Sequence, residues 1–485
     1  MMDAVYENEI NEAGLYYERT ERTSDIQLPP AMNILLLALW AVICLIGFAV
    51  IFLAENAVAG ILIIGVPTVV GMIIKPTFAL CIMMLVLPTG AGIGVQQDFS
   101  LDRGVGIALA IAFALNLLIT RPGLRVGNKG LWVLIMYTLW VLLTLVAAPY
   151  FAQELIRAFT QVQLLALVFI VYWILQTNQA KSFQWALRSY VVGTLGTITL
   201  AFMSGAAIQV LEDTAEGRYA ATLGSAIDAN MLAGLTAMAF LAAMYLFARD
   251  KSLPWRVVYL AAMVVLPIML LRIGSRGALI ALVFTLLSPF LFVRQVLRRP
   301  ALALLLLAVV LVASVSAGLM VRERGLEASV AKRLTDIGLA EQAVSYRMMP
   351  IRQAVKAVTV KPTGTSYYGW FEQSGLRILP HSDFFLALGV YGIPGGALFA
   401  LFVVLMMFTV KRTPLGLEKL YGRAVLTFLL VMGLSIGQLY QKHFWVFLVF
   451  VMAGERIGRL YTPGGDLEAG TEYGEEQLTE VQALY

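Results

Sequence analysis

Long apolar runs separated by short polar connections recur along most of the chain. Each run has about the 17–25 residues that an α-helix needs to cross the hydrocarbon core of a bilayer. The pattern therefore predicts an all-α polytopic membrane protein with about 12–14 transmembrane helices. The expected spans lie near residues 32–53, 57–74, 77–94, 104–120, 130–149, 157–176, 187–208, 228–248, 256–273, 277–293, 300–319, 383–409, 421–438 and 443–460. The crowded stretch 57–94 also fits one span plus a re-entrant piece.

Polar stretches divide the chain into five parts. Residues 1–30 form a Glu-rich tail without the basic start of a secretory signal. A first group of helices is expected in 31–319, a large loop with short amphipathic helices in 320–382, and a last group of helices in 383–460. Residues 461–485 have the composition of an acidic, disordered tail.

Basic residues alternate in density from one connection to the next. Clusters follow every second span, at 121–129, 181–188, 249–256, 294–299, 411–423 and 456–459, whereas the opposite connections carry single residues. Because cytoplasmic loops are enriched in Lys and Arg, both termini are expected in the cytoplasm and the 320–382 loop on the outer face. That loop carries several basic residues, which long loops tolerate on either side of a membrane.

Composition removes several classes of function. Hydrophobic residues make up 60% of the chain and charged residues 13%, about half the charged share of a soluble domain. The formal net charge of +5 does not indicate nucleic-acid binding, because the basic residues lie in the topology clusters. Cys44 and Cys81 lie inside apolar runs, and the chain has two histidines. Neither a disulfide nor a metal centre is therefore expected.

Four residues of the expected outer face are candidates for chemistry. Arg218 lies in LEDTAEGRYAATLGSAIDAN and Arg347 in the large loop, where a lone arginine is usually solvated or bound to headgroups. Arg276 lies in LRIGSRGAL, in a turn so tight that the charge must sit at or within the membrane surface, where it needs a partner or a water-filled cavity. His381 follows Pro380 at an expected helix start, whose dipole favours neutral imidazole.

Two neighbouring patterns complete the picture. Apolar residues at spacings of four and three predict an amphipathic helix over 344–358, lying on the membrane or the protein body, with Arg347 at the edge of its apolar face. An ordinary surface helix fits the same spacing. The second histidine, His443, lies between Tyr440 and Trp445 and is expected to be an interfacial anchor.

Three stretches in order resemble the O-antigen ligase and O-antigen polymerase superfamily of bacterial glycan-assembly membrane proteins. They are GSRGAL at 274–279, SYRMMPIRQAV with KPTGTSYYG at 345–369, and PHSDFFLALGVYGIPGGALF at 380–399. RYAATLGSAIDANMLAG, which contains Arg218, is a weaker fourth match. The resemblance covers about residues 218–410; upstream of these, only the general pattern of spans agrees.

The resemblance implies transfer of a glycan from an undecaprenyl-diphosphate carrier to an acceptor hydroxyl, with inversion at the anomeric carbon and without a metal or cofactor. It implies His381 as the catalytic residue and Arg276, Arg347 and Arg218 as diphosphate-binding residues. It places the chain in the bacterial inner membrane with its site facing the periplasm, in contact with the bilayer and with other polysaccharide-assembly proteins. Exopolysaccharide or O-antigen polymerisation is expected, with ligation as the alternative.

Two other classes remain open. A lipid-linked oligosaccharide flippase would show internal repeats, broken helices and intramembrane charge pairs, and the sequence has no duplicated halves. A non-catalytic scaffold for envelope assembly is opposed only by the histidine and arginine constellation.

Overall fold

The computed structural model describes residues 29–53, 57–89, 94–96, 99–120, 127–203, 229–288, 337–376 and 378–460. Its elements are α2 (Pro30–Leu53), α3 (Ala57–Ile74), α4 (Pro76–Val86), η1 (Leu87–Thr89), β1 (Gly94–Gln96), β2 (Phe99–Ser100), α5 (Leu101–Thr120), α6 (Lys129–Thr144), η2 (Leu145–Ala147), α7 (Phe151–Met203), α8 (Ala229–Arg249), α9 (Leu253–Ile273), α10 (Arg276–Leu287), α13 (Ile337–Val360), α14 (Tyr367–Ser374), α15 (Asp383–Arg412), α16 (Leu417–Gly433) and α17 (Lys442–Leu460).

The helical membrane character expected from the sequence is confirmed. Within the described ranges, five helices are long and apolar enough to cross a bilayer. They are α6 with η2, the first part of α7, α8, α9 and α15. A small antiparallel hairpin of β1 and β2 was not expected. The expected span at 300–319 and the first part of the large loop lie outside the described residues.

Helix α4 is the shortest element among the expected spans. Its 11 residues rise only about 16 Å, roughly half the thickness of the hydrocarbon core. Leu80, Met83 and Met84 on this helix are fully buried. A Cβ on Gly193 would overlap the carbonyl group of Leu85, so α7 approaches α4 to backbone contact. The short length fits the re-entrant piece rather than a full span.

Helix α7 joins two expected spans into one element of 53 residues. A straight helix of this length would measure about 80 Å. Two contacts with α17 show its course. Gln176 is hydrogen-bonded to Arg456 near the end of α17, whereas Tyr190, further along α7, packs against Phe447 near the start of α17. The second half thus returns along α17, while the first half begins beside Tyr440 at that same start. A straight helix could not make these contacts, so α7 changes direction between Gln176 and Tyr190, where the sequence indicated a loop.

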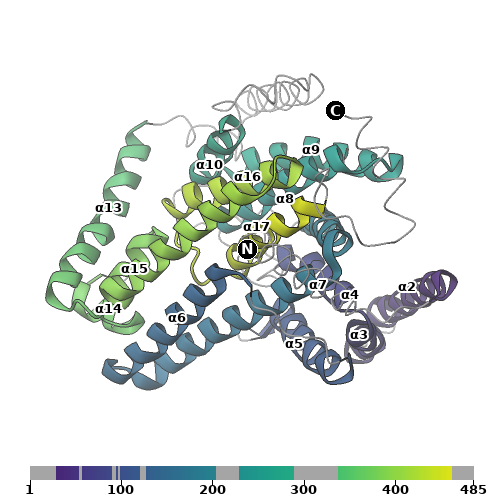
Figure 1. Cartoon of the computed structure of the whole chain (residues 1–485), viewed down its shortest axis with the longest axis horizontal. Helices are drawn as coiled ribbons and strands as arrows, with labels where there is room; N and C mark the ends of the chain where they lie inside the picture. The colour runs from purple at the N-terminus through teal and green to yellow at the C-terminus, as the bar shows by residue number, and fades with distance from the viewer. Residues whose placement is uncertain are drawn as a thin grey trace, which may run out of the picture.

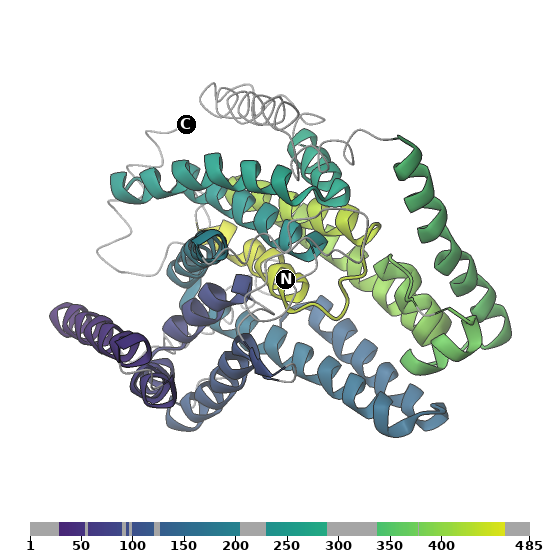
Figure 2. The same ribbon diagram turned by 180° about the vertical axis from the view of Figure 1, so that it is seen from behind.

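Helix α17 forms the centre of the bundle (Figures 1 and 2). Its side chains are buried over most of its length, including Trp445 and Phe447. In both views α2 and α3 project from one side of the bundle, and α13 lies at the periphery of the opposite side. The core therefore sits around the last helix, and the first described helices lie at the edge.

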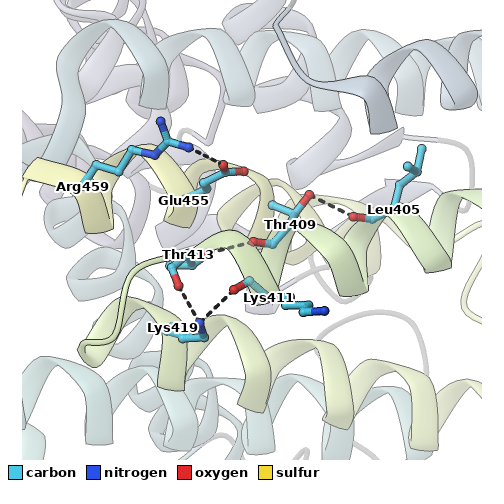
Figure 3. Close-up of polar contacts among 7 residues, drawn as sticks. All are labelled: Leu405, Thr409, Lys411, Thr413, Lys419, Glu455 and Arg459. Carbon is cyan, nitrogen blue, oxygen red and sulfur yellow. Dashed lines mark hydrogen bonds and ion pairs between the residues drawn. The ribbon is translucent and has the colours of Figure 1, made fainter. Parts of the chain in front are cut away.

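Basic residues of three connections expected in the cytoplasm gather at one end of the bundle, which we call the basic end. Arg188 of α7 pairs with Asp250 after α8 at 2.6 Å. Across the turn from α15 to α16, the Nζ of Lys419 donates to the carbonyls of Lys411 and Thr413 at 2.8 and 2.7 Å (Figure 3). These bonds satisfy carbonyls that the end of α15 leaves without helical partners.

Candidate functional site

Arg276 lies at the opposite end of the bundle, in the turn between α9 and α10. Gly274 ends α9 in the left-handed conformation with φ of 69°, so the chain reverses within two residues. The hydroxyl of Ser275 caps α10 and donates to Asn230 Oδ1 at 2.9 Å. The Nε atoms of Arg276 and of Arg272, one turn earlier, are both buried. Two guanidinium groups thus lie partly inside the protein at this turn.

His381 lies directly before α15 and is partly exposed. Ser382 precedes the helix in extended conformation, and Asp383 is the first helical residue. The Asp383 side chain is buried, and its Oδ1 accepts the backbone N–H of Leu439 at 3.0 Å and that of Gln438. Two backbone donors therefore hold the start of α15, and with it the histidine segment, against the chain between α16 and α17.

The residues between α16 and α17, which we call the 434–441 connection, contact both candidate segments. A Cβ on Gly277, the second residue of α10, would lie 2.5 Å from Ser435 Oγ. Further along, a Cβ on Gly437 would lie 3.4 Å from the carbonyl oxygen of Pro380. The arginine turn and the histidine segment, about a hundred positions apart in sequence, are thus held against one short piece of chain.

The loop after α13 is hydrogen-bonded to α15 where the α15 helix is broken. At Gly392 the backbone leaves helical geometry, with φ of 71° and ψ of −168°. The N–H groups of Thr365 and Ser366 donate to the carbonyl of Val390 at 2.9 and 3.0 Å, and the carbonyl of Pro362 accepts the N–H that follows Gly392. The loop therefore supplies hydrogen bonds that the broken helix cannot make within itself.

The same loop leads into α14, which α7 holds from its other side. The buried carboxylate of Glu154 accepts the N–H groups of Tyr367 and Tyr368 at the start of α14. Arg157, one turn further along α7, places its guanidinium 4.4 Å from the ring centre of Tyr367, and Tyr440 of the 434–441 connection lies 5.5 Å from the same ring. We call Arg157, Tyr367, Tyr368 and Tyr440 the tyrosine–arginine cluster.

Two tyrosines of this cluster, Tyr367 and Tyr440, have a pKa above the usual range of a phenol. Burial raises the pKa of Tyr440 well above its usual range, and neighbouring phenols, Tyr391 first, raise it further. Burial also raises the pKa of Tyr367, against the opposing effect of Arg157. The hydroxyl of Tyr440 lies 2.6 Å from that of Tyr391. Tyr367 and Tyr440 therefore keep their protons and remain hydrogen-bond donors as well as acceptors.

The other two arginines are placed less fully. Arg218 lies outside the described residues, and for Arg347 the structure describes only the backbone, within α13. By helical periodicity, position 347 lies about 20° around the axis from position 354. Ala354 is buried against Gly389 of α15, so position 347 lies on the side of α13 that faces the bundle.

The apolar face of α13 was expected to lie on the membrane or on the protein body. Met348 and Val355 of this face are 39% and 50% exposed, and the helix packs on the protein through Ala354. Small residues allow two helix backbones to approach closely. The packing energy gained in this way can exceed that gained by burying larger apolar side chains when lipid covers those side chains. His443 is only 4% exposed, so it is a core residue and not an interfacial anchor, because α17 is central.

Sequence reasoning missed Asp383, Glu154 and the tyrosine–arginine cluster. Asp383 was visible as an acidic residue at an expected helix start, where the dipole favours it. Glu154 and Arg157 were visible as opposite charges one turn apart at the edge of an apolar run. Their partners come from distant parts of the chain, and no spacing in the sequence joins them.

The arrangement offers a proton acceptor, a pair of guanidinium groups and phenol donors around one connection. Within the ranges that the structure describes, no three His, Cys, Asp or Glu side chains come together as a metal site would require. Comparison with models of protein families and with curated proteins finds no match to this chain.

Proposed function

We propose that this protein transfers a glycan from a polyprenyl-diphosphate carrier to an acceptor hydroxyl on the periplasmic face of a bacterial inner membrane, extending an exopolysaccharide or O-antigen. The observation that carries the proposal is the common position of the Arg276 turn and the His381 segment against the 434–441 connection. The resemblance rests on the order of these residues along the sequence. Their common contact with one connection supports a shared role.

The reaction needs three contributions from the chain. His381 accepts the proton of the acceptor hydroxyl while the hydroxyl oxygen forms a bond to the anomeric carbon. The bond from that carbon to the diphosphate oxygen breaks, and the carrier diphosphate leaves with the electron pair. Arg276 and Arg272 donate hydrogen bonds to the diphosphate oxygens, where charge grows in the transition state. Attack from the side opposite the leaving group inverts the anomeric centre.

Asp383 has a positioning role in this proposal. Its carboxylate fixes the first turn of α15 to the backbone of Leu439 and Gln438, so the imidazole two residues earlier keeps its place relative to the arginine turn. Arg347 on the bundle-facing side of α13 and Arg218 are proposed as further diphosphate ligands. Their side chains would add donors to the same anion.

The test is turnover of an undecaprenyl-diphosphate repeat by purified protein in lipid nanodiscs. His381→Ala should lower the rate by about 10²–10⁴-fold, the usual contribution of a general base. Arg276→Lys should cost on the order of 2–4 kcal/mol of transition-state stabilisation, because an ammonium group cannot make the bidentate fork. Arg352→Ala and Lys356→Ala are matched controls, since both side chains are exposed on α13, and should retain wild-type rates.

The products separate the competing functions. Long glycans indicate polymerisation, and a single transfer to a different acceptor indicates ligation. If the intact lipid-linked repeat crosses the bilayer and no new glycosidic bond forms, the protein is a flippase and the proposed transfer is wrong. Wild-type turnover by His381→Ala would remove the base from the mechanism.

A further inference from the structure

The tyrosine–arginine cluster lies beside the histidine segment but has no part in the mechanism above. Its members come from three distant elements: Arg157 from α7, Tyr367 and Tyr368 from α14, and Tyr440 from the 434–441 connection. All four side chains are partly exposed. Aromatic rings and an arginine that remain accessible in a bundle so largely apolar favour a binding surface for a polar ligand.

The guanidinium of Arg157 is held in a fixed position. It lies over the Tyr367 ring at 4.4 Å and is hydrogen-bonded to the side chain of Tyr368. Glu154 fixes the two tyrosines in turn, through its bonds to their backbone N–H groups. A guanidinium carries five N–H donors, and stacking on a ring uses none of them. Arg157 is therefore a preorganised donor whose position does not depend on a ligand.

The position of the cluster relative to the histidine is given by the 434–441 connection. Ser435 abuts the arginine turn, Gly437 abuts Pro380, and Tyr440 contacts Tyr367. The six residues from Ser435 to Tyr440, five steps along the backbone, reach at most about 18 Å. The arginine turn, the histidine segment and the cluster therefore all contact one connection that is no longer than a short oligosaccharide.

We propose that the tyrosine–arginine cluster binds the acceptor glycan and presents its hydroxyl to His381. Partly exposed rings suit the C–H face of a sugar, while Arg157 and the neutral phenols suit its hydroxyls. The diphosphate of the donor needs concentrated positive charge, which the Arg272 and Arg276 turn supplies and the cluster does not. This assignment rests on the proposed function for its identity as the acceptor side, while sugar binding by the cluster can be measured without turnover.

Binding to purified His381→Ala protein in nanodiscs tests the assignment, since this variant keeps both surfaces and does not consume the ligand. The probes are the lipid-free repeat oligosaccharide, released by mild acid from the producing strain's lipid-linked glycan, and inorganic pyrophosphate. In this background, Tyr367→Leu and Arg157→Gln should each weaken oligosaccharide binding about tenfold, the equivalent of roughly 1.4 kcal/mol. Both should leave pyrophosphate binding within twofold of the background protein.

Three further variants keep the result interpretable. Tyr367→Phe retains the ring but removes the hydroxyl, and should weaken oligosaccharide binding less than Tyr367→Leu does, while pyrophosphate binding in both variants shows that the protein is folded. Phe151→Leu removes an aromatic side chain that is 57% exposed on the first turn of α7, and should change neither probe. Arg276→Lys should weaken pyrophosphate binding and spare the oligosaccharide.

The outcomes separate this inference from the proposed function. Oligosaccharide binding that is unaffected by Tyr367→Leu and Arg157→Gln would overturn the acceptor surface, even if transfer by the wild-type protein is observed. A loss of both probes in these variants would also overturn it, because the cluster would then be structural. Binding of anionic lipid vesicles at Arg157 in place of the oligosaccharide would assign the cluster to lipid headgroups. If the oligosaccharide binds as expected but the wild-type protein transfers no glycan, the cluster remains a saccharide-binding surface and the proposed enzymatic function is wrong.

Discussion

The junction between α15 and the loop after α13 can be tested by a single methyl group. Gly392 has φ of 71° and ψ of −168°, a region that is essentially restricted to glycine and costs other residues about 1–3 kcal/mol. A Cβ there would also overlap the carbonyl oxygen of Pro362 and the backbone nitrogen of Gly364. Both are backbone atoms, so neither can rotate away, and overpacking of this kind adds about 1–3 kcal/mol. Gly392→Ala should therefore destabilise the protein by roughly 2–6 kcal/mol.

Two other glycines separate the contributions. Gly375 also has a positive φ, 65°, but nothing lies within 4 Å of its missing Cβ, so Gly375→Ala should show the conformational cost alone. Gly196 lies in α7 with nothing within 4 Å of its missing Cβ, and alanine there should be neutral or slightly stabilising because it favours the helix. The expected order of stability is Gly196→Ala, then Gly375→Ala, then Gly392→Ala.

The assay is the midpoint of thermal unfolding of each purified variant in one detergent, with hydrogen exchange to locate the change. Gly392→Ala should lower the midpoint most and should increase exchange at Thr365 and Ser366, whose N–H groups bond α15 at the break. A midpoint for Gly392→Ala equal to that of Gly375→Ala would refute the reasoning, because the backbone contact would then contribute nothing.

Three further predictions follow from other contacts. Asp383→Asn should lower stability by about 1–3 kcal/mol, because it places an amide NH₂ group in a buried site where the aspartate Oδ1 accepts two backbone N–H groups; unchanged unfolding in denaturant would contradict this. Burial opposes ionisation of Asp250, but a backbone N–H and the Arg188 guanidinium outweigh it and lower its pKa. The ionised Asp250 side chain therefore stabilises the protein at pH values above the ordinary aspartate pKa, and this stabilisation is lost as the pH falls through the lowered pKa. The loss of stability at acidic pH should be absent in Asp250→Asn. In a cysteine-free background, a cysteine at exposed Glu372 should react with an impermeant thiol reagent in intact cells and one at exposed Lys251 should not; the reverse labelling would invert the orientation.

The sequence by itself determined that the chain is a helical membrane protein and where many of its helices lie. Apolar runs of bilayer length predict helices because lipid cannot satisfy backbone hydrogen bonds, and α2, α3, α8, α9 and α17 begin and end within a few residues of the expected spans. The tight turn at Arg276 and the helix start after His381 also followed from local signals, which were the short interval between two apolar runs and the position of Pro380.

The tertiary structure alone decided which residues meet. The backbone of Tyr367 and the carboxylate of Glu154 that binds it are 213 positions apart, and neither has a local pattern that points to the other. The same holds for the choice of face on α13. Its apolar stripe fitted contact with the membrane or with the protein body, and the close approach of Ala354 to Gly389 decides which side packs on the bundle. Hydropathy predicts which segments leave water, whereas the fit between helix surfaces determines which side chains surround His381.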